Sequence, residues 1–436
     1  MSLKNTIKEA ELWLDRGDEF IKQENFDKAL ECYTRSISIN PRAAFAYFKR
    51  GSAYETIGKL QESLNDYNNT ILINPNFSFA HFRRGSLHFD DNQLDKAIMD
   101  FTNAIELNEE FSFAYYKRGL ARAMLKYNDA AMEDFSKCIE LNPTYILAYL
   151  NRANKYFELK KYEDAIQDYT KVVQIDPKHE RAFISRGIAL GNLLQYKEAL
   201  SDYSKAIQIN PNSIVALNYR GLIYSKMKEY QKARDDFARV IKLKPGMHEV
   251  HNNRGIANYA IKNYSDAVED FSIALSLHPN QPNIYFNRAN AYYNMRNFTE
   301  ALADYEQAID LEPRMTSAYF GKGNANVALQ RYKDAIRDFS KAIAVDVKFT
   351  QAYVGRGNAY LKMKFPQKAL DDFSLAIEIS PDNPQVYLNR GTAYKTENQI
   401  EKAAKDFNIF LKLSKPSVIT KKIRDWFDKV DKVPEF

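Results

Sequence analysis

The sequence predicts an all-α repeat protein, a solenoid of twelve helix-turn-helix units of 34 residues with a C-terminal capping helix. Three recurring features predict it: a proline, a glycine and an aromatic residue, each at a fixed place in the unit. With Ala10 as repeat position 1, twelve units run from Ala10 to Ser417 without insertion or deletion. Position 32 holds nine of the 14 prolines: Pro41, Pro75, Pro143, Pro177, Pro211, Pro245, Pro279, Pro313 and Pro381.

Two helices are predicted in each unit. Positions 4, 7, 8 and 11 share one face of the first helix, and positions 20, 24, 27 and 28 share one face of the second. Position 8 is glycine in ten units, position 20 is alanine in eleven, and position 24 is aromatic in all twelve. We expect the small residue at position 8 to let the helices approach beside the ring, and proline at position 32 to end the second helix.

A charge pair is predicted inside each hairpin. Position 7 is arginine in eleven units, with Lys322 in the tenth, and position 23 is aspartate in eleven, with Cys32 in the first. In an antiparallel hairpin that turns near position 16, these two positions face each other. Because the pair repeats along the chain, we interpret it as a structural ladder that sets the register, and we assign it no catalytic role.

The two ends of the chain are predicted to be helical. Residues 1–9 extend the first helix, with Ser2 as its cap, and residues 418–436 form an amphipathic helix after the repeats of 10–417. Its apolar stripe comprises Ile419, Ile423, Trp426, Phe427 and Val430. The last hairpin of a solenoid exposes an apolar face, so a capping role is favoured over membrane or partner binding.

Composition makes several function classes unlikely. A net charge of +6 is low for a nucleic-acid binder, and no apolar run is long enough to cross a membrane, which favours a cytoplasmic protein. Cys32 and Cys138 are too few for a disulfide framework, and His248 and His251 lack further ligands for a metal. Only 28 residues lie outside the repeats, which leaves no room for a catalytic domain. We therefore expect no enzyme, no metal and no cofactor.

The repeat resembles the tetratricopeptide repeat (TPR) family, whose 34-residue unit has its Trp, Gly, aromatic, Ala and Pro residues at these places. In the first unit the pattern is carried by Trp13, Gly17, Phe20, Ala29, Tyr33 and Pro41. The resemblance implies a right-handed superhelix whose first helices line a concave groove. It also implies protein binding, with positions 2, 5, 6, 9, 12 and 13 of the first helices facing the groove.

An asparagine row is the first candidate site. An amide donates and accepts hydrogen bonds, so it can hold the backbone of an extended peptide regardless of sequence. The row looks like the one that lines the groove of the superhelical domain of O-linked N-acetylglucosamine transferases, and we interpret the glycines beside it as room for a close backbone approach by a ligand. The candidate residues are Asn151, Asn154, Asn253, Asn287, Asn290, Asn324, Asn358 and Asn389, with Gly321 and Gly355.

An aromatic and basic patch in units 2 to 4 is the second candidate site. Such a surface suits an extended or helical segment with apolar anchors and acidic residues, because rings contribute buried area and cations contribute steering. The alternative is that some of the rings pack between neighbouring first helices. The patch comprises Phe45, Phe48, Lys49, Phe79, Phe82, Arg83, Phe113, Tyr116 and Lys117.

Two functions follow from these features. The first is a non-enzymatic scaffold or adaptor, a monomer within a complex, that binds protein or peptide partners in its groove. The second is a structural assembly subunit contacted through its convex face, where the seventh unit carries most of the net charge. Its basic residues are Arg220, Lys226, Lys228, Lys232, Arg234, Arg239, Lys242 and Lys244.

Overall fold

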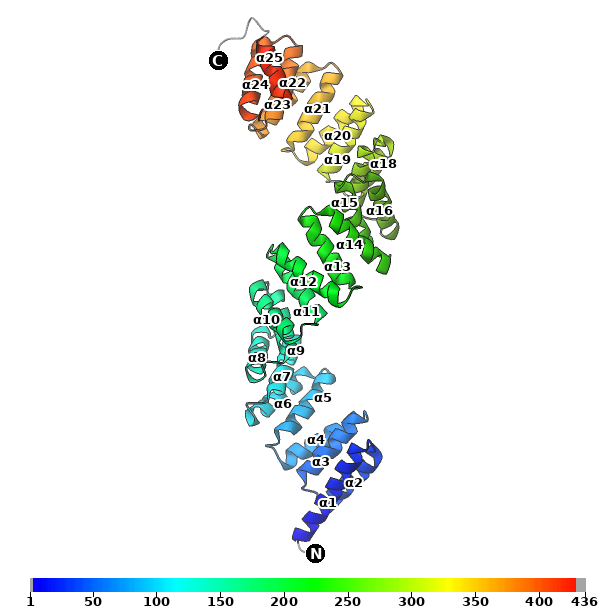
Figure 1. The fold of residues 1–436 in the computed structure, drawn as a ribbon, viewed down its shortest axis with the longest axis vertical. Coiled ribbons are helices and arrows are strands. Elements are labelled where there is room, and N and C mark those ends of the chain that lie inside the picture. The colour runs from blue at the N-terminus through cyan, green and yellow to red at the C-terminus, as the bar shows by residue number, and fades with distance from the viewer. Residues whose placement is uncertain (1–2, 429–436) are drawn as a thin grey trace. The chain divides into compact units, whose positions relative to one another are not determined.

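The computed structural model describes residues 3–428, and within them the chain is all-α, as predicted. The helices follow one another as hairpins, α1 with α2 through α23 with α24, and α25 comes last (Figure 1). The chain divides into two compact units, Met1–Pro211 and Asn212–Phe436, and each is described by itself. Ser2 and Val430, assigned above to a cap and to the apolar stripe, lie outside the described residues.

The helix bounds repeat with the period of the sequence. The first helices are α1 (Leu3–Lys22), α3 (Ala44–Thr56), α5 (Ser78–Asp90), α7 (Ser112–Met124), α9 (Ile146–Glu158), α11 (Glu180–Asn192), α13 (Ile214–Lys226), α15 (His248–Ala260), α17 (Pro282–Asn294), α19 (Thr316–Ala328), α21 (Thr350–Lys362) and α23 (Pro384–Thr396). The second helices are α2 (Phe26–Ile39), α4 (Leu60–Ile73), α6 (Leu94–Leu107), α8 (Asn128–Leu141), α10 (Tyr162–Ile175), α12 (Tyr196–Ile209), α14 (Tyr230–Leu243), α16 (Tyr264–Leu277), α18 (Phe298–Leu311), α20 (Tyr332–Val345), α22 (Pro366–Ile379) and α24 (Ile400–Leu413).

The contact between small residues and rings inside each hairpin is confirmed. At Gly187 of α11 an added Cβ would lie 2.7 Å from the Tyr203 ring of α12, which is far inside van der Waals contact. The close packing against the ring thus favours glycine at repeat position 8, and this gain offsets its helix cost of about 1 kcal/mol. The ring at position 24 is buried in every hairpin.

A second set of small residues joins each hairpin to the preceding one, and the sequence analysis missed it. Ala352 and Ala359, at repeat positions 3 and 10 of α21, belong to one buried cluster with Phe339 and Ala342 of α20. Position 3 is buried in the first helices α3 to α23. The alanine that recurs at position 3 indicates close helix packing, as the glycine that recurs at position 8 does.

The predicted ladder of arginine and aspartate is present. In α9 and α10, Arg152 Nε and Nη2 donate to the two carboxylate oxygens of Asp168 at 2.8 and 2.7 Å. The other bidentate pairs are Arg50–Asp66, Arg84–Asp100, Arg118–Asp134, Arg186–Asp202, Arg220–Asp236, Arg254–Asp270, Arg288–Asp304, Arg356–Asp372 and Arg390–Asp406. Lys322 departs from the pattern, because it donates to Glu306 of the preceding hairpin at 3.2 Å.

The final helix α25 (Val418–Phe427) packs on α24, although one residue of its predicted apolar stripe does not take part. A capping box between Ser417 and Thr420 starts the helix. Ile423 is buried in a cluster that Trp426 joins, whereas Ile419 is 47% exposed. The expectation for Ile419 was wrong because Thr420, held by the capping box, is the buried residue of that turn.

Candidate functional site

The predicted asparagine row lies on first helices, and the structure places its members on each compact unit separately. In residues 212–436 the helices α15, α17, α19, α21 and α23 contact one another in sequence, so their asparagines lie on neighbouring helices. These asparagines are Asn253, Asn287, Asn290, Asn324, Asn358 and Asn389. The remaining two, Asn151 and Asn154, lie on α9 in residues 1–211.

Two asparagines at repeat position 9 accept hydrogen bonds inside their own hairpins. The Tyr169 hydroxyl donates to Asn154 Oδ1 at 2.7 Å, and the Tyr305 hydroxyl donates to Asn290 Oδ1 at 2.6 Å. Each tyrosine is the buried ring at position 24. These two amides therefore complete the packing of a tyrosine, and their oxygens are already engaged.

Two further members of the row also have intramolecular bonds. Asn151 Nδ2 donates to the Tyr116 hydroxyl at 3.2 Å and to the Leu147 carbonyl at 2.8 Å. Asn389 Oδ1 accepts from Gln385 Nε2 at 3.0 Å. Each of these amides keeps only part of its hydrogen-bonding capacity for a partner.

Four asparagines keep their full capacity: Asn253, Asn287, Asn324 and Asn358. Within the part of the chain that the structure describes, their side chains make no hydrogen bond, and none of the four is buried. Asn324 and Asn358 occupy the position that Asn290 does, but the ring of their hairpins is phenylalanine, which has no hydroxyl to donate. One such amide therefore stands on each of α15, α17, α19 and α21.

Gly321 and Gly355 have a packing explanation that the sequence analysis did not contain. A Cβ on Gly321 would lie 2.6 Å from the Tyr305 ring, and one on Gly355 would lie 2.8 Å from the Phe339 ring. Each ring belongs to the second helix of the preceding hairpin. The space beside both glycines is thus filled by protein, so a ligand is not needed to account for them.

The rings of the aromatic patch divide into exposed and packed members. Phe45, Phe79 and Phe113, at the start of α3, α5 and α7, are 47%, 52% and 48% exposed. Phe48 and Phe82 are half-buried, and Tyr116 is buried. The interpretation as an exposed surface therefore applies to one ring of each first helix, and the interpretation as packing applies to the other.

A third ring per hairpin completes this patch, and the sequence analysis missed it. Phe77, which precedes α5, lies against Phe45 and Phe48 with ring centroids 6.2 and 4.9 Å away. Phe111 contacts Phe79 and Phe82 in the same way, and Tyr145 contacts Phe113 and Tyr116. These inserted rings hold the exposed phenylalanines in place.

The basic row of the patch is largely neutralised within the protein. Lys49 Nζ donates to Asp18 at 3.1 Å, and Arg83 Nη1 donates to Glu55 at 3.2 Å. Lys117 lies 5.1 Å from the centroid of the Phe89 ring. Because carboxylates of the preceding hairpins balance two of the three cations, the patch offers apolar contact more than electrostatic steering.

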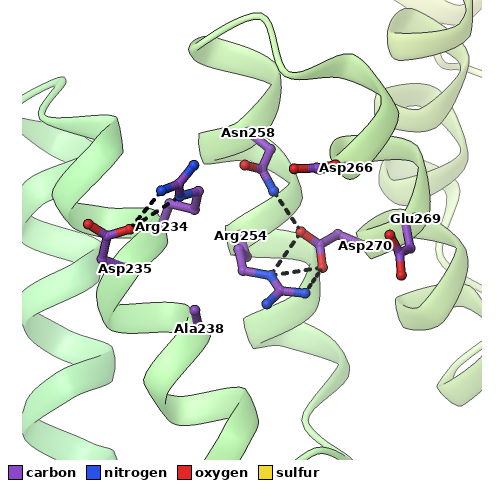
Figure 2. Close-up of a pocket in the computed structure, with 8 residues that line it drawn as sticks. All are labelled: Arg234, Asp235, Ala238, Arg254, Asn258, Asp266, Glu269 and Asp270. Atoms are coloured by element: carbon purple, nitrogen blue, oxygen red, sulfur yellow. Dashed lines mark hydrogen bonds and ion pairs between the residues drawn. The ribbon is translucent and has the colours of Figure 1, made fainter.

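Lys232 and Arg234 of the basic seventh unit have acidic partners, and a cavity lies beside this unit. Lys232 donates to Glu229 at 2.6 Å and Arg234 to Asp235 at 3.0 Å. A cavity of about 410 Å³ opens between α14 and the hairpin of α15 and α16 (Figure 2). Its lining residues are Arg234, Asp235, Ala238, Arg254, Asn258, Asp266, Glu269 and Asp270.

The histidines of the predicted metal spacing have protein partners. His251 is buried with Nε2 2.9 Å from the Pro245 carbonyl oxygen, and the His248 ring lies 4.8 Å from that of His278. Residues 3–428 contain no group of three histidine, cysteine or acidic side chains placed to hold a metal ion. None of the helices described combines the length and apolar character that crossing a membrane requires.

Family models for the tetratricopeptide repeat match most of the chain. The matched residues are 146–179, 180–213 and 214–247 for one model, 286–346 and 325–384 for a second, 46–77, 80–111, 114–145 and 384–415 for a third, and 17–58 and 257–295 for one described as TPR repeat. A search of curated proteins finds no match.

Solved structures of helical repeat proteins are similar over long stretches. Yeast Tom70 is 17% identical, with 90% of this chain and 96% of that chain covered and a TM-score of 0.38. A tetratricopeptide repeat protein from Parabacteroides merdae is 18% identical over 57% and 98%, with a TM-score of 0.44. The APC/C hetero-tetramer Cut9–Hcn1 is 13% identical over 98% and 96%, with a TM-score of 0.43. Similarity at this level carries no information about function.

Proposed function

The chain belongs to the tetratricopeptide repeat family, and from that premise we propose that it is a non-enzymatic scaffold that binds extended protein segments along its first helices. Stacked helical hairpins present long surfaces that serve protein interaction. In this proposal the first helices line a concave groove, the partners are proteins or peptides, and the scaffold acts as a cytoplasmic monomer within complexes.

The observation that supports this proposal is the row of four unengaged amides, Asn253, Asn287, Asn324 and Asn358. They stand on four consecutive first helices that contact one another. Each amide offers a donor and an acceptor, which is what the backbone of an extended segment needs at regular intervals. The row thus suits recognition of backbone rather than of particular side chains.

The exposed rings of Phe45, Phe79 and Phe113 are a second contact in this proposal. Each ring is held by an inserted neighbour, so little side-chain entropy remains to be lost on binding. Aromatic residues with this kind of support are frequent anchors in interfaces. Apolar side chains of a bound segment would fit here.

The test is affinity capture from native lysate with the wild-type chain and with an Asn287→Ala, Asn324→Ala and Asn358→Ala variant. Because these amides make no bond inside the protein, their removal leaves the fold intact, and we expect partners to be lost. Mass spectrometry at fixed salt measures the retained proteins.

The matched control removes three exposed glutamines from second helices, through Gln167→Ala, Gln208→Ala and Gln307→Ala. It deletes the same number of side-chain amides from the second helices α10, α12 and α18, and the partner set should stay that of the wild type. If the asparagine variant retains every partner, the groove proposal fails.

A further inference from the structure

The arginine of the ladder makes a second kind of bond, which links each hairpin to the preceding one. Arg288 Nη1 donates to Ser272 Oγ at 2.9 Å, while Nε and Nη2 hold Asp304. Ser272 stands at repeat position 25 of the preceding second helix. The same bond joins Arg50 to Thr34, Arg84 to Asn68, Arg118 to Thr102, Arg152 to Ser136, Arg186 to Thr170, Arg356 to Ser340 and Arg390 to Ser374.

Arg254 has no such acceptor, because Ala238 occupies repeat position 25 of α14. Its Nε and Nη2 hold Asp270 at 2.5 to 3.0 Å, and Nη1 makes no hydrogen bond within residues 3–428. Figure 2 shows this nitrogen turned away from Asp270, on the side of Ala238. Ala238 and Arg254 both line the cavity of about 410 Å³, a volume within the range of about 300–1,000 Å³ usual for ligand sites.

Asn258, one turn after Arg254 on α15, adds an unmatched acceptor. It is 3% exposed and donates through Nδ2 to Asp270 at 3.0 Å, and its Oδ1 has no partner among the described residues. A buried amide oxygen without a donor costs free energy that a ligand N–H would recover. An unmatched donor and an unmatched acceptor in one cavity correspond to the C=O and N–H of a polypeptide backbone.

The charges at the cavity indicate which kind of side chain such a ligand would carry. Arg254 is balanced by Asp270, and Arg234 by Asp235. Asp266 accepts only from the Asn263 amide, and Glu269 has no ion pair in the described part of the chain. Two carboxylates on the α16 side therefore remain without a cation, which favours a positively charged group at the mouth.

We propose that this cavity binds a lysine or arginine residue of a partner polypeptide. The backbone carbonyl of that residue accepts from Arg254 Nη1, and its cationic side chain lies against Asp266 and Glu269. The site opens between α14 and the hairpin of α15 and α16 and uses none of the asparagines of the row, so it would recruit a basic segment while the groove holds another chain.

The test uses short fluorescein-labelled peptides of glycine and serine that carry lysine, glutamate or norleucine at the same places, with anisotropy read at low salt. The lysine peptide should bind the full chain more tightly than the other two. An Asp266→Asn and Glu269→Gln variant should lose about tenfold in affinity, as expected for a charged hydrogen bond. Equal or tighter binding of the glutamate peptide would overturn the proposal.

Two matched variants separate the site from general charge effects. Asp129→Asn with Glu133→Gln removes the same charge from α8, where Thr102 satisfies the ladder arginine, and should leave lysine-peptide binding unchanged. Ala238→Ser provides the acceptor that Ser272 gives Arg288, and should weaken binding several-fold. No effect of Ala238→Ser, or an equal loss in the α8 variant, contradicts the assignment. The asparagine variant should bind this peptide normally, so the two proposals fail separately.

Discussion

Repeat position 15 adopts the left-handed backbone conformation in every hairpin of the described chain, yet it is glycine only at Gly58. The residue follows the end of each first helix. In α11, for instance, Gln195 N donates to the Leu190 carbonyl at 2.9 Å across Leu194, whose φ is 60°. This pattern ends a helix by satisfying its last carbonyls, and glycine is the residue it favours. The repeats therefore tolerate strain at a turn that glycine would relieve.

Leu194→Gly is expected to stabilise the protein. Leu194 is 67% exposed, so little burial is lost, and the left-handed cost of about 1–2 kcal/mol is exchanged for a smaller entropic cost of glycine. We expect a gain of about 0.5–1 kcal/mol, measured by urea unfolding. Gly58→Leu makes the opposite change where an added Cβ meets nothing within 4 Å, and should destabilise. Destabilisation by Leu194→Gly would refute the strain argument.

Cys138 should be unreactive in the folded protein. Burial raises the pKa of its thiol to about 11, and the thiolate is the nucleophile. In a Cys32→Ser background, alkylation at pH 8 should proceed only on the time scale of unfolding and become fast in denaturant. Because the folded pKa is raised above the ordinary value of 9.0, this thiol's contribution to stability is present below that value and is lost as pH rises through about 11. Rapid labelling of the native chain would contradict its burial.

At the scale of elements, the ladder joins second helices through the arginine of the first helix between them. Arg152, for example, bonds Asp168 of its own hairpin and Ser136 of the preceding one. Removing one partner of a buried ion pair leaves the other charge uncompensated, which is strongly destabilising. Asp338 is the internal comparison, because Lys322 is bonded to Glu306 and Asp338 is left with the Asn326 amide.

Asp304→Asn and Asp338→Asn should have different effects on stability. The first leaves Arg288 unpaired and should cost about 2–3 kcal/mol, less than for a fully buried pair because Arg288 is 19% exposed. The second removes a carboxyl whose pKa burial raises, so stability should be unchanged or higher at neutral pH. Chemical denaturation of both variants measures the change in the free energy of unfolding.

The pH dependence gives a further check on this pair of variants. With a raised folded pKa, the contribution of Asp338 is present at low pH and is lost as pH rises through that pKa. Asp338→Asn should remove this dependence. If Asp304→Asn and Asp338→Asn lose equal stability, the arginine partner does not determine the cost of removing the carboxylate.

At the scale of the whole molecule, each hairpin contacts its neighbours in sequence and little else within its compact unit. The free energy of unfolding of such a chain is the sum of the stability of each hairpin and of its interfaces with the neighbouring hairpins. A destabilising substitution therefore affects mainly the hairpins around it. This also explains how the residues of the candidate surfaces vary along the chain while the packing residues recur, because the two sets occupy different faces of the first helix.

Phe339→Ala should open one segment of the chain. The ring packs on Gly323 of its own hairpin and on Gly355 of the next, so its loss should cost about 3–5 kcal/mol where α19, α20 and α21 meet. Hydrogen exchange should rise in these helices and stay unchanged in α3 to α8. Uniform loss of protection across the chain would show cooperative unfolding instead.

The helical hairpin, its core and the Arg–Asp pair could all be predicted from the sequence. These features depend on contacts between residues about sixteen apart in one unit, such as Arg152 and Asp168. Because the period is constant, the residues of each contact recur at the same positions along the chain and can be recognised in the sequence. The candidate surfaces were also located from sequence, because they are the varying positions of a recurring helix. Whether they bind a partner stays a prediction.

Which surface groups are available to a partner could not be predicted from the sequence and depends on the packing of the helices. The Tyr305 hydroxyl engages Asn290 between the two helices of one hairpin, and Asp18 engages Lys49 of the next hairpin, a contact whose geometry a single unit does not specify. The cavity beside Ala238 is of the same kind. Each depends on where side chains of different helices meet, and a vacancy is visible only once the neighbours that surround it are placed.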